Sequence, residues 1–98
     1  MNYHQGDVLL ERIERLPADA EYLRDEIVQR GELTGHTHRI KDSKIYHSKE
    51  LGAACVEITN PSPMTHEDHP QTEEIESGVY KVRIQQEYFP EGNQNVKD

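Results

Sequence analysis

Residues 79–89 read Val-Tyr-Lys-Val-Arg-Ile-Gln-Gln-Glu-Tyr-Phe, and apolar and polar side chains alternate along most of this stretch. Because successive side chains of a β-strand point to opposite faces, the even-numbered residues are expected to share one face. That face is apolar except for Gln86, and a buried amide needs hydrogen-bond partners. Gln86 therefore either satisfies backbone groups or lines a pocket, and we take Gln86 and Tyr88 as candidate ligand-binding residues.

Shorter stretches elsewhere in the chain also favour strands. Residues 52–59 place Ala54, Val56 and Ile58 on one apolar face. Further strand candidates lie at residues 6–13, 26–30, 36–40, 44–48 and 73–76. Turn residues separate these segments, and no long helix is indicated. The sequence thus predicts an all-β fold, a small single-domain barrel or sandwich of six to seven short strands.

The chain has 98 residues, of which 33% are hydrophobic, and it contains no Trp. This length fits one domain, which we place at residues 1–90, followed by a polar C-terminal tail at residues 91–98. A domain of this size buries only a modest fraction of its surface. We therefore expect added stability from a bound metal, a ligand or a symmetric partner chain, so a homo-oligomer is one expectation.

The formal net charge is −8, which argues against non-specific binding of nucleic acid, because such binding needs a basic face. The charge is uneven along the chain. Residues 24–49 carry six basic and four acidic side chains, whereas residues 66–98 carry three basic and eight acidic ones. A small anionic ligand near the first of these segments stays open as a partner.

Cys55 is the single cysteine of the chain, so an intrachain disulfide is excluded. Its neighbours are small and apolar, which favours a buried strand residue over a nucleophile. No signal-peptide pattern and no apolar run of membrane-spanning length is visible. We therefore expect no membrane association and a cytoplasmic location.

Two histidine pairs form the strongest candidate site. His36 and His38 lie two residues apart and, on a strand, share one face, with Ile40 pointing inward beside them. His66 and His69 lie in a predicted loop rich in proline. Imidazole is the commonest protein ligand for transition metals, so these four histidines predict a site for a divalent metal, zinc first, with iron or manganese as alternatives.

Glu67 and Asp68 lie between the histidines of the second pair. Each could bind the metal, hydrogen-bond to a residue that binds it, or act as a general base. We take Glu67 as the candidate catalytic residue. A metal-free alternative uses two histidines as acid and base, with Arg39 or Arg83 stabilising developing charge, and Arg39 is therefore a candidate for ligand binding. In a third interpretation the histidines are ordinary surface residues, as we expect for His4 and His47.

Three stretches carry a resemblance. Gly31–Ile40 reads Gly-Glu-Leu-Thr-Gly-His-Thr-His-Arg-Ile, His66–His69 reads His-Glu-Asp-His, and Gly78–Tyr88 reads Gly-Val-Tyr-Lys-Val-Arg-Ile-Gln-Gln-Glu-Tyr. In this order they resemble a group of small prokaryotic and phage-type proteins without an established activity, which usually have Glu at the place of Asp68. The resemblance implies a site at the histidines but no reaction.

A looser resemblance is to the cupins, small β-barrels with a His-x-His metal motif. In cupins a glutamate follows this pair closely, whereas here the chain continues Arg39-Ile40-Lys41-Asp42. The resemblance therefore implies only a general barrel architecture.

Three functions follow as hypotheses from these patterns. The first is a small His-rich β-barrel that binds a divalent metal, with metal-dependent hydrolysis as its activity. The second is a non-enzymatic binding protein of phage or mobile-element type, for a small anionic ligand such as a nucleotide or for a partner protein. The third is an oligomeric structural protein. The sequence alone does not decide whether the chain is an enzyme.

Overall fold

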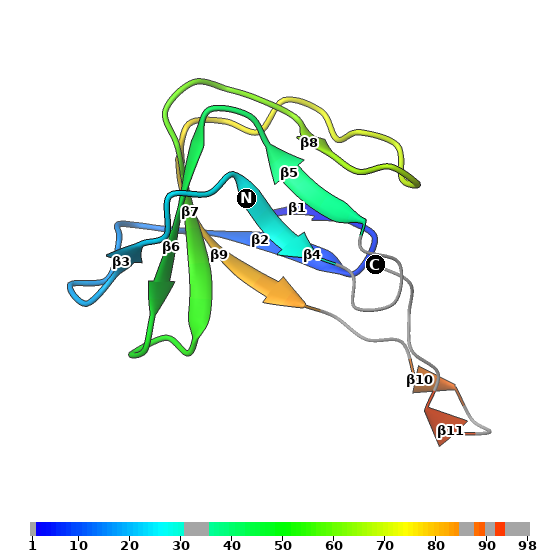
Figure 1. Ribbon diagram of the computed structural model, residues 1–98, viewed down its shortest axis with the longest axis horizontal. Coiled ribbons are helices and arrows are strands. Elements are labelled where there is room, and N and C mark those ends of the chain that lie inside the picture. The colour runs from blue at the N-terminus through cyan, green and yellow to red at the C-terminus, as the bar shows by residue number, and fades with distance from the viewer. Residues whose placement is uncertain (1, 31–35, 85–87, 90–91, 94–98) are drawn as a thin grey trace.

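The computed structural model describes residues 2–30, 36–84, 88–89 and 92–93, and it confirms the predicted all-β class (Figure 1). No helix occurs among these residues. The strands are β1 (Asn2–Gln5), β2 (Val8–Ile13), β3 (Glu21–Tyr22), β4 (Ile27–Arg30), β5 (Thr37–Ile40), β6 (Ser43–Ser48), β7 (Ala53–Ile58), β8 (Met64–Thr65), β9 (Gly78–Ile84), β10 (Tyr88–Phe89) and β11 (Gly92–Asn93).

Nine of these strands form two antiparallel sheets that pack face to face. The large sheet has the order β1-β2-β9-β7-β6-β3, and the small sheet has the order β4-β5-β8. A single hydrophobic cluster joins them, with Leu10 and Tyr80 from the large sheet and Val28, Ile40 and Met64 from the small one. Burial of these apolar side chains between the two sheets is the main force that holds the fold together.

The large sheet is open within the described part of the chain, with β1 and β3 at its edges. Of the two predicted architectures, the sandwich therefore fits and the closed barrel does not, so the barrel analogy with cupins gains no support. The number of strands exceeds the six or seven predicted. The additional ones include β3 and β8, which are only two residues long and too short to produce a recognisable alternation.

Within residues 79–89, the described part that forms β9 follows the predicted alternation as far as Val82. Tyr80 and Val82 of β9 are buried, but Ile84 is 43% exposed. β9 pairs with β2 as far as the pair Val8–Ile84, and there the partner strand begins. The predicted inward position of Ile84 is therefore wrong, while the continuation of one strand to residue 89 stays a prediction, because residues 85–87 lie outside the described part of the chain.

Tyr88–Phe89 form β10, which pairs with β11 in a separate two-stranded sheet. Tyr88 is part of β10, but only its backbone is described, and Gln86 lies outside the described residues. The proposed ligand-binding roles of these two residues therefore stay predictions. Gly92–Asn93 of β11 fall within the predicted polar tail and show that strand pairing continues into it.

Cys55 is fully buried in β7, as predicted, and burial raises the pKa of its thiol.

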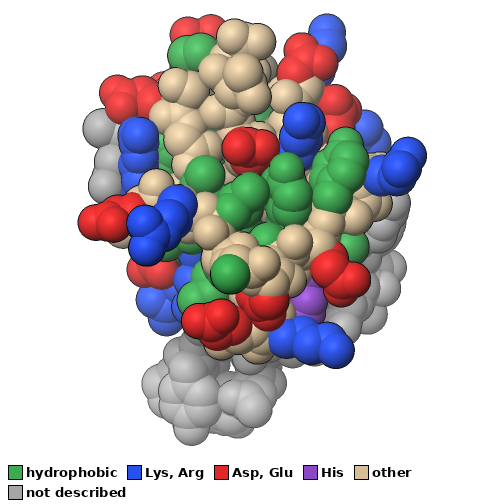
Figure 2. Space-filling view, turned by 90° about the vertical axis from the view of Figure 1, so that its left-hand side faces the viewer, with side chains coloured by type: hydrophobic (Ala, Val, Ile, Leu, Met, Phe, Trp, Pro, Cys, Tyr) green, Lys and Arg blue, Asp and Glu red, His purple; other side chains and the backbone are tan. Residues whose placement is uncertain are grey.

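In the part of the chain that the structure covers, no helix has the length and apolar character needed to cross a bilayer. Figure 2 shows hydrophobic side chains at the surface between charged ones on one face of the molecule. At the β3 edge, Tyr22 and Leu23 are 49% and 51% exposed.

Candidate functional site

The pairing of β5 with β8 brings the two histidine pairs together. Arg39 lies opposite Thr65, and Ile40 lies opposite Met64, in an antiparallel register. Continued by one, two and three residues, this register sets residue 38 opposite 66, 37 opposite 67, and 36 opposite 68. The observed contacts follow this order, because Thr37 N–H donates to Glu67 Oε1 at 2.9 Å.

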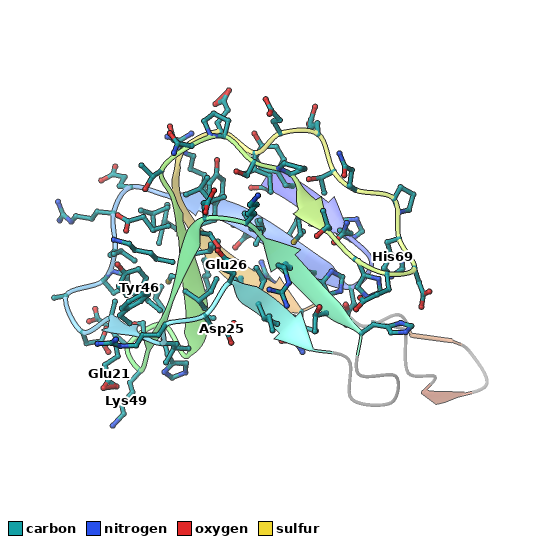
Figure 3. All side chains as sticks on the ribbon, turned by 45° about the horizontal axis from the view of Figure 1, so that its top comes forward. Glu21, Asp25, Glu26, Tyr46, Lys49 and His69 are labelled. Carbon is teal, nitrogen blue, oxygen red and sulfur yellow. The ribbon has the colours of Figure 1, made fainter. Side chains whose placement is uncertain are left out.

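The four predicted histidines form one cluster of rings. The ring of His66 lies in the middle, with its centroid 4.4 Å from those of His38 and His69 and 5.6 Å from that of His36. The rings of His38 and His69 are 5.9 Å apart. His69 follows β8, at the end of the molecule away from β3 and its residue Glu21 (Figure 3). The structure therefore brings together all four residues that the sequence proposed as metal ligands.

His38 is completely buried, and its hydrogen bonds determine which ring nitrogen carries the proton. The Gln5 side-chain NH₂ donates to the backbone carbonyls of Met64 and Pro70, both at 2.9 Å. Gln5 Oε1 is therefore the atom that faces His38 Nδ1, at 3.0 Å, and it can only accept. His38 Nδ1 must then donate, which turns Nε2 toward Asp7 Oδ1 at 3.4 Å.

His36 precedes β5 and is less buried than predicted, since its side chain keeps 32% of its exposure. Its Nδ1 lies 2.6 Å from Asp68 Oδ2. The backbone N–H of Asp68 also donates to His66 Nδ1 at 2.9 Å, so Asp68 contacts both histidines.

Glu67 is exposed, and its pKa is lowered, first by the hydrogen bond from the Thr37 backbone and further by the nearby His36 and His66. A carboxylate with a lowered pKa stays ionised at neutral pH and is a weaker base than usual. One ligand atom from each of His36, His66 and Glu67 can be chosen so that all three lie within 4.8 Å of one another. Among the residues described, this is the group of three or more His, Cys, Asp or Glu side chains whose ligand atoms lie close enough to share one metal ion.

The turn between β1 and β2 forms the other wall of the site. Gln5 pairs with Val8, so Gly6 and Asp7 make a two-residue turn, and Gly6 has a φ of +58°. Glycine adopts this backbone conformation without strain. A Cβ atom at Gly6 would also lie only 2.6 Å from His69 Nε2, so glycine allows the imidazole to lie against the turn.

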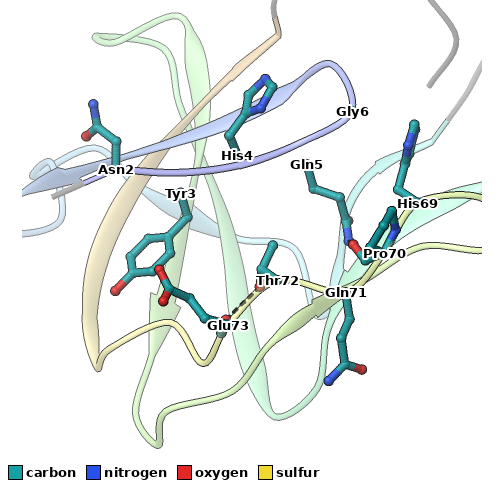
Figure 4. A pocket seen from close by; sticks show the side chains of 10 residues that line it. All are labelled: Asn2, Tyr3, His4, Gln5, Gly6, His69, Pro70, Gln71, Thr72 and Glu73. Carbon is teal, nitrogen blue, oxygen red and sulfur yellow. Dashed lines mark hydrogen bonds between the residues drawn. The ribbon is translucent and has the colours of Figure 1, made fainter.

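An open groove of about 430 Å³ runs beside this turn, between β1 and residues 69–73 (Figure 4). Gln5, Gly6 and His69 line it, so the groove reaches the histidine cluster from one side. A smaller hollow of about 250 Å³ lies on the other side, with Arg39 and Glu67 in its lining. Solvent and small solutes therefore have access to the cluster from two directions.

Arg39 points to the side of β5 opposite His38, as the alternation of a strand requires. It is 49% exposed and forms an ion pair with Glu26 at 3.9 Å, a kind of surface contact that contributes little stability. Its hollow is shared with His66 and Glu67. Its predicted ligand-binding role is thus compatible with its position but stays a prediction.

Sequence reasoning missed Gln5 and Asp7, whose side-chain oxygens lie 3.0 and 3.4 Å from the two ring nitrogens of His38. The pattern Gly6-Asp7 before an apolar run indicates a turn, and nothing in it indicates that the turn meets a strand some thirty residues later in the chain. Their contribution follows from the packing of the two sheets. The burial of Gln5, which is 3% exposed on a short edge strand, is visible only in the folded chain.

Comparisons with curated proteins and with solved structures found no match. A family model does match, over residues 4–85, and this range includes the histidine cluster, Gln5 and Asp7 but ends before Gln86 and Tyr88. With most of its length covered by that match, the chain belongs to the family described as a domain of unknown function, DUF8820.

Proposed function

We propose that this protein binds a divalent metal ion, zinc in the first place, through His36, His66 and Glu67. The observation that carries the proposal is the separation of their ligand atoms, all within 4.8 Å of one another. Two imidazoles and one carboxylate form a set of ligands that suits zinc, with iron or manganese as alternatives. We call this set the outer site.

Asp68 supports the outer site because its carboxylate lies beside His36, one of the proposed ligands. Metal-binding histidines usually donate their other ring N–H to a carboxylate or carbonyl, which orients the ring. Asp68 Oδ2 lies 2.6 Å from His36 Nδ1, a position from which the carboxylate can orient this ring. In His66 the lone pair of the neutral ring is on Nδ1, because this atom accepts the Asp68 N–H. An ion that takes this lone pair replaces that hydrogen bond.

Three protein ligands leave a position for water, the arrangement typical of catalytic zinc. Arg39, in the same hollow, would attract an anionic substrate. Hydrolysis of an anionic ester is therefore the activity we propose for this site. Glu67 serves as a ligand in this proposal, since its lowered pKa makes it a poor general base.

The metal content of the protein tests the proposal. Untagged protein, purified without nickel resin and freed of metal with a chelator, is dialysed against zinc, and bound zinc is measured by mass spectrometry. Glu67→Gln and His36→Ala should each hold one ion fewer per chain than the wild type. Glu74→Gln, which removes one charge from an exposed residue, is the matched control. Equal zinc in Glu67→Gln, His36→Ala and the wild type would refute the outer site.

A second candidate function is binding of a small anionic ligand, such as a nucleotide, without catalysis. The exposed guanidinium of Arg39 in its hollow favours this candidate. Such a binding protein would be of phage or mobile-element type, as the resemblance implies. Its partner could also be another protein or a second copy of this chain. Nucleotides should then raise the melting temperature of the wild type and not that of Arg39→Ala, because a ligand stabilises the state that binds it. The absence of any shift would count against this candidate.

A further inference from the structure

We propose that Asp7 and His38 hold a second divalent cation, on the side of His66 away from His36. We call this pair the inner site. The inference deepens the proposed metal-binding function and rests on it for the kind of ligand, but its residues are different. Three observations carry it: the orientation of the His38 ring, the distance between His38 Nε2 and Asp7 Oδ1, and the surroundings of the pair.

The first observation is the fixed orientation of His38. Gln5 uses its NH₂ group for two backbone carbonyls and offers only its oxygen to His38 Nδ1. His38 Nδ1 therefore donates to Gln5, and Nε2 is the ring nitrogen that faces Asp7. A buried acceptor behind Nδ1 is the arrangement that normally orients a metal-binding histidine.

The second observation is the distance of 3.4 Å between His38 Nε2 and Asp7 Oδ1. A hydrogen bond between a charged imidazole and a carboxylate is usually shorter, at about 2.7–2.9 Å. Two ligands of one tetrahedral zinc ion, each about 2.0–2.2 Å from the metal, lie about 3.3–3.5 Å apart. The observed separation thus matches the edge of a metal site better than it matches a direct hydrogen bond.

The third observation is the environment of the pair. His38 is fully buried and the Asp7 side chain is only 13% exposed, so water screens their charges weakly. The rings of His66 and His69 lie beside His38, at 4.4 and 5.9 Å between centroids, so the pair lies among imidazoles and not among apolar side chains alone. Gly6, which precedes Asp7 in the chain, and His69 both line the groove beside β1, so this groove comes close to the pair.

Zinc stoichiometry separates the two sites. The wild type should hold two ions per chain, and Asp7→Asn, which keeps the size of the side chain but removes its charge, should hold one. Glu67→Gln should also hold one, and Glu74→Gln should hold two. Circular dichroism of each variant shows that the fold is retained. The inner ion should bind at least about tenfold more weakly in Asp7→Asn. Loss of a residue that only hydrogen-bonds to a metal ligand already weakens metal binding by about tenfold or more.

A measurement on the wild type makes the test independent of any variant. In long-range ¹H–¹⁵N spectra, zinc should shift the Nε2 resonance of His38 while Nδ1 keeps its proton. Protons on both nitrogens in the presence of zinc would show that the pair is an ordinary ion pair and would overturn the inner site.

The outcomes also distinguish the inner site from the outer one. Two ions in Asp7→Asn, or a single wild-type ion lost only in Glu67→Gln, would overturn the inner site. A single ion lost in Asp7→Asn but kept in Glu67→Gln would support the inner site and refute the outer one. A wild-type chain that takes up no zinc would refute both.

Discussion

Replacement of Gln5 by leucine should strongly destabilise the fold, because this one side chain ties three segments together. It extends from the edge strand β1 and donates to the backbone carbonyls of Met64 and Pro70. It also accepts the hydrogen bond from His38 Nδ1. Leucine has a similar size, so the substitution removes the three hydrogen bonds without opening a large cavity.

The expected loss follows from these partners. Each hydrogen bond contributes about 1 kcal/mol net, and a buried group left without its partner costs about 1–3 kcal/mol. Met64 and His38 are fully buried, whereas Pro70 is exposed and water can replace its partner. The three lost hydrogen bonds together cost about 3 kcal/mol. The greater hydrophobicity of leucine offsets part of this loss. We therefore expect a loss of about 2 kcal/mol, or a melting temperature lower by about 8–16 °C in a domain of this size.

Urea unfolding, followed by circular dichroism, measures this change in the free energy of unfolding. The matched control is Gln71→Leu, because Gln71 is exposed and lines the same groove as Gln5. The control should lie within about 0.5 kcal/mol of the wild type. A similar small change in Gln5→Leu would mean that the three hydrogen bonds do not hold β1 to β5 and to the segment after β8, and the protonation assigned to His38 would lose its basis.

Three further predictions concern other parts of the structure. Gly6→Ala should lower the free energy of unfolding by at least about 1 kcal/mol in thermal melts, because φ is positive there and the new Cβ meets His69; an unchanged melting temperature would contradict this. The lowered pKa of Glu67 adds stability that is complete above its ordinary value of 4.5 and is lost as the pH falls through the lower folded value. Glu67→Gln should therefore flatten the acid side of a stability–pH curve, and an identical curve would refute the role of the Thr37 hydrogen bond. Cys55 should react with a thiol reagent only in unfolded protein, since it is fully buried with a raised pKa, and fast labelling of native protein would contradict that burial.

The sequence was sufficient for the fold class because strands in a half-buried sheet alternate with a period of two. The pattern correctly identified Tyr80 and Val82 on one side of β9 and Val56 and Ile58 in β7 as buried residues. It failed at residue 84, where the alternation continues but the neighbouring strand does not. Alternation reports the local preference of a segment, whereas the length of a strand in a sheet also depends on its partner.

The candidate site shows the same division between local and long-range information. The two histidine pairs were visible because each is a local motif, and the register of β5 against β8 then set them side by side. Gln5 and Asp7 carry no motif, and they reach His38 only because the β1–β2 turn of one sheet meets β5 of the other. The residues that determine the protonation of His38 thus come from the packing of two sheets, and in this small domain the same packing that buries the core also builds the site. A loss of metal binding in a core variant should for this reason be interpreted only together with its stability.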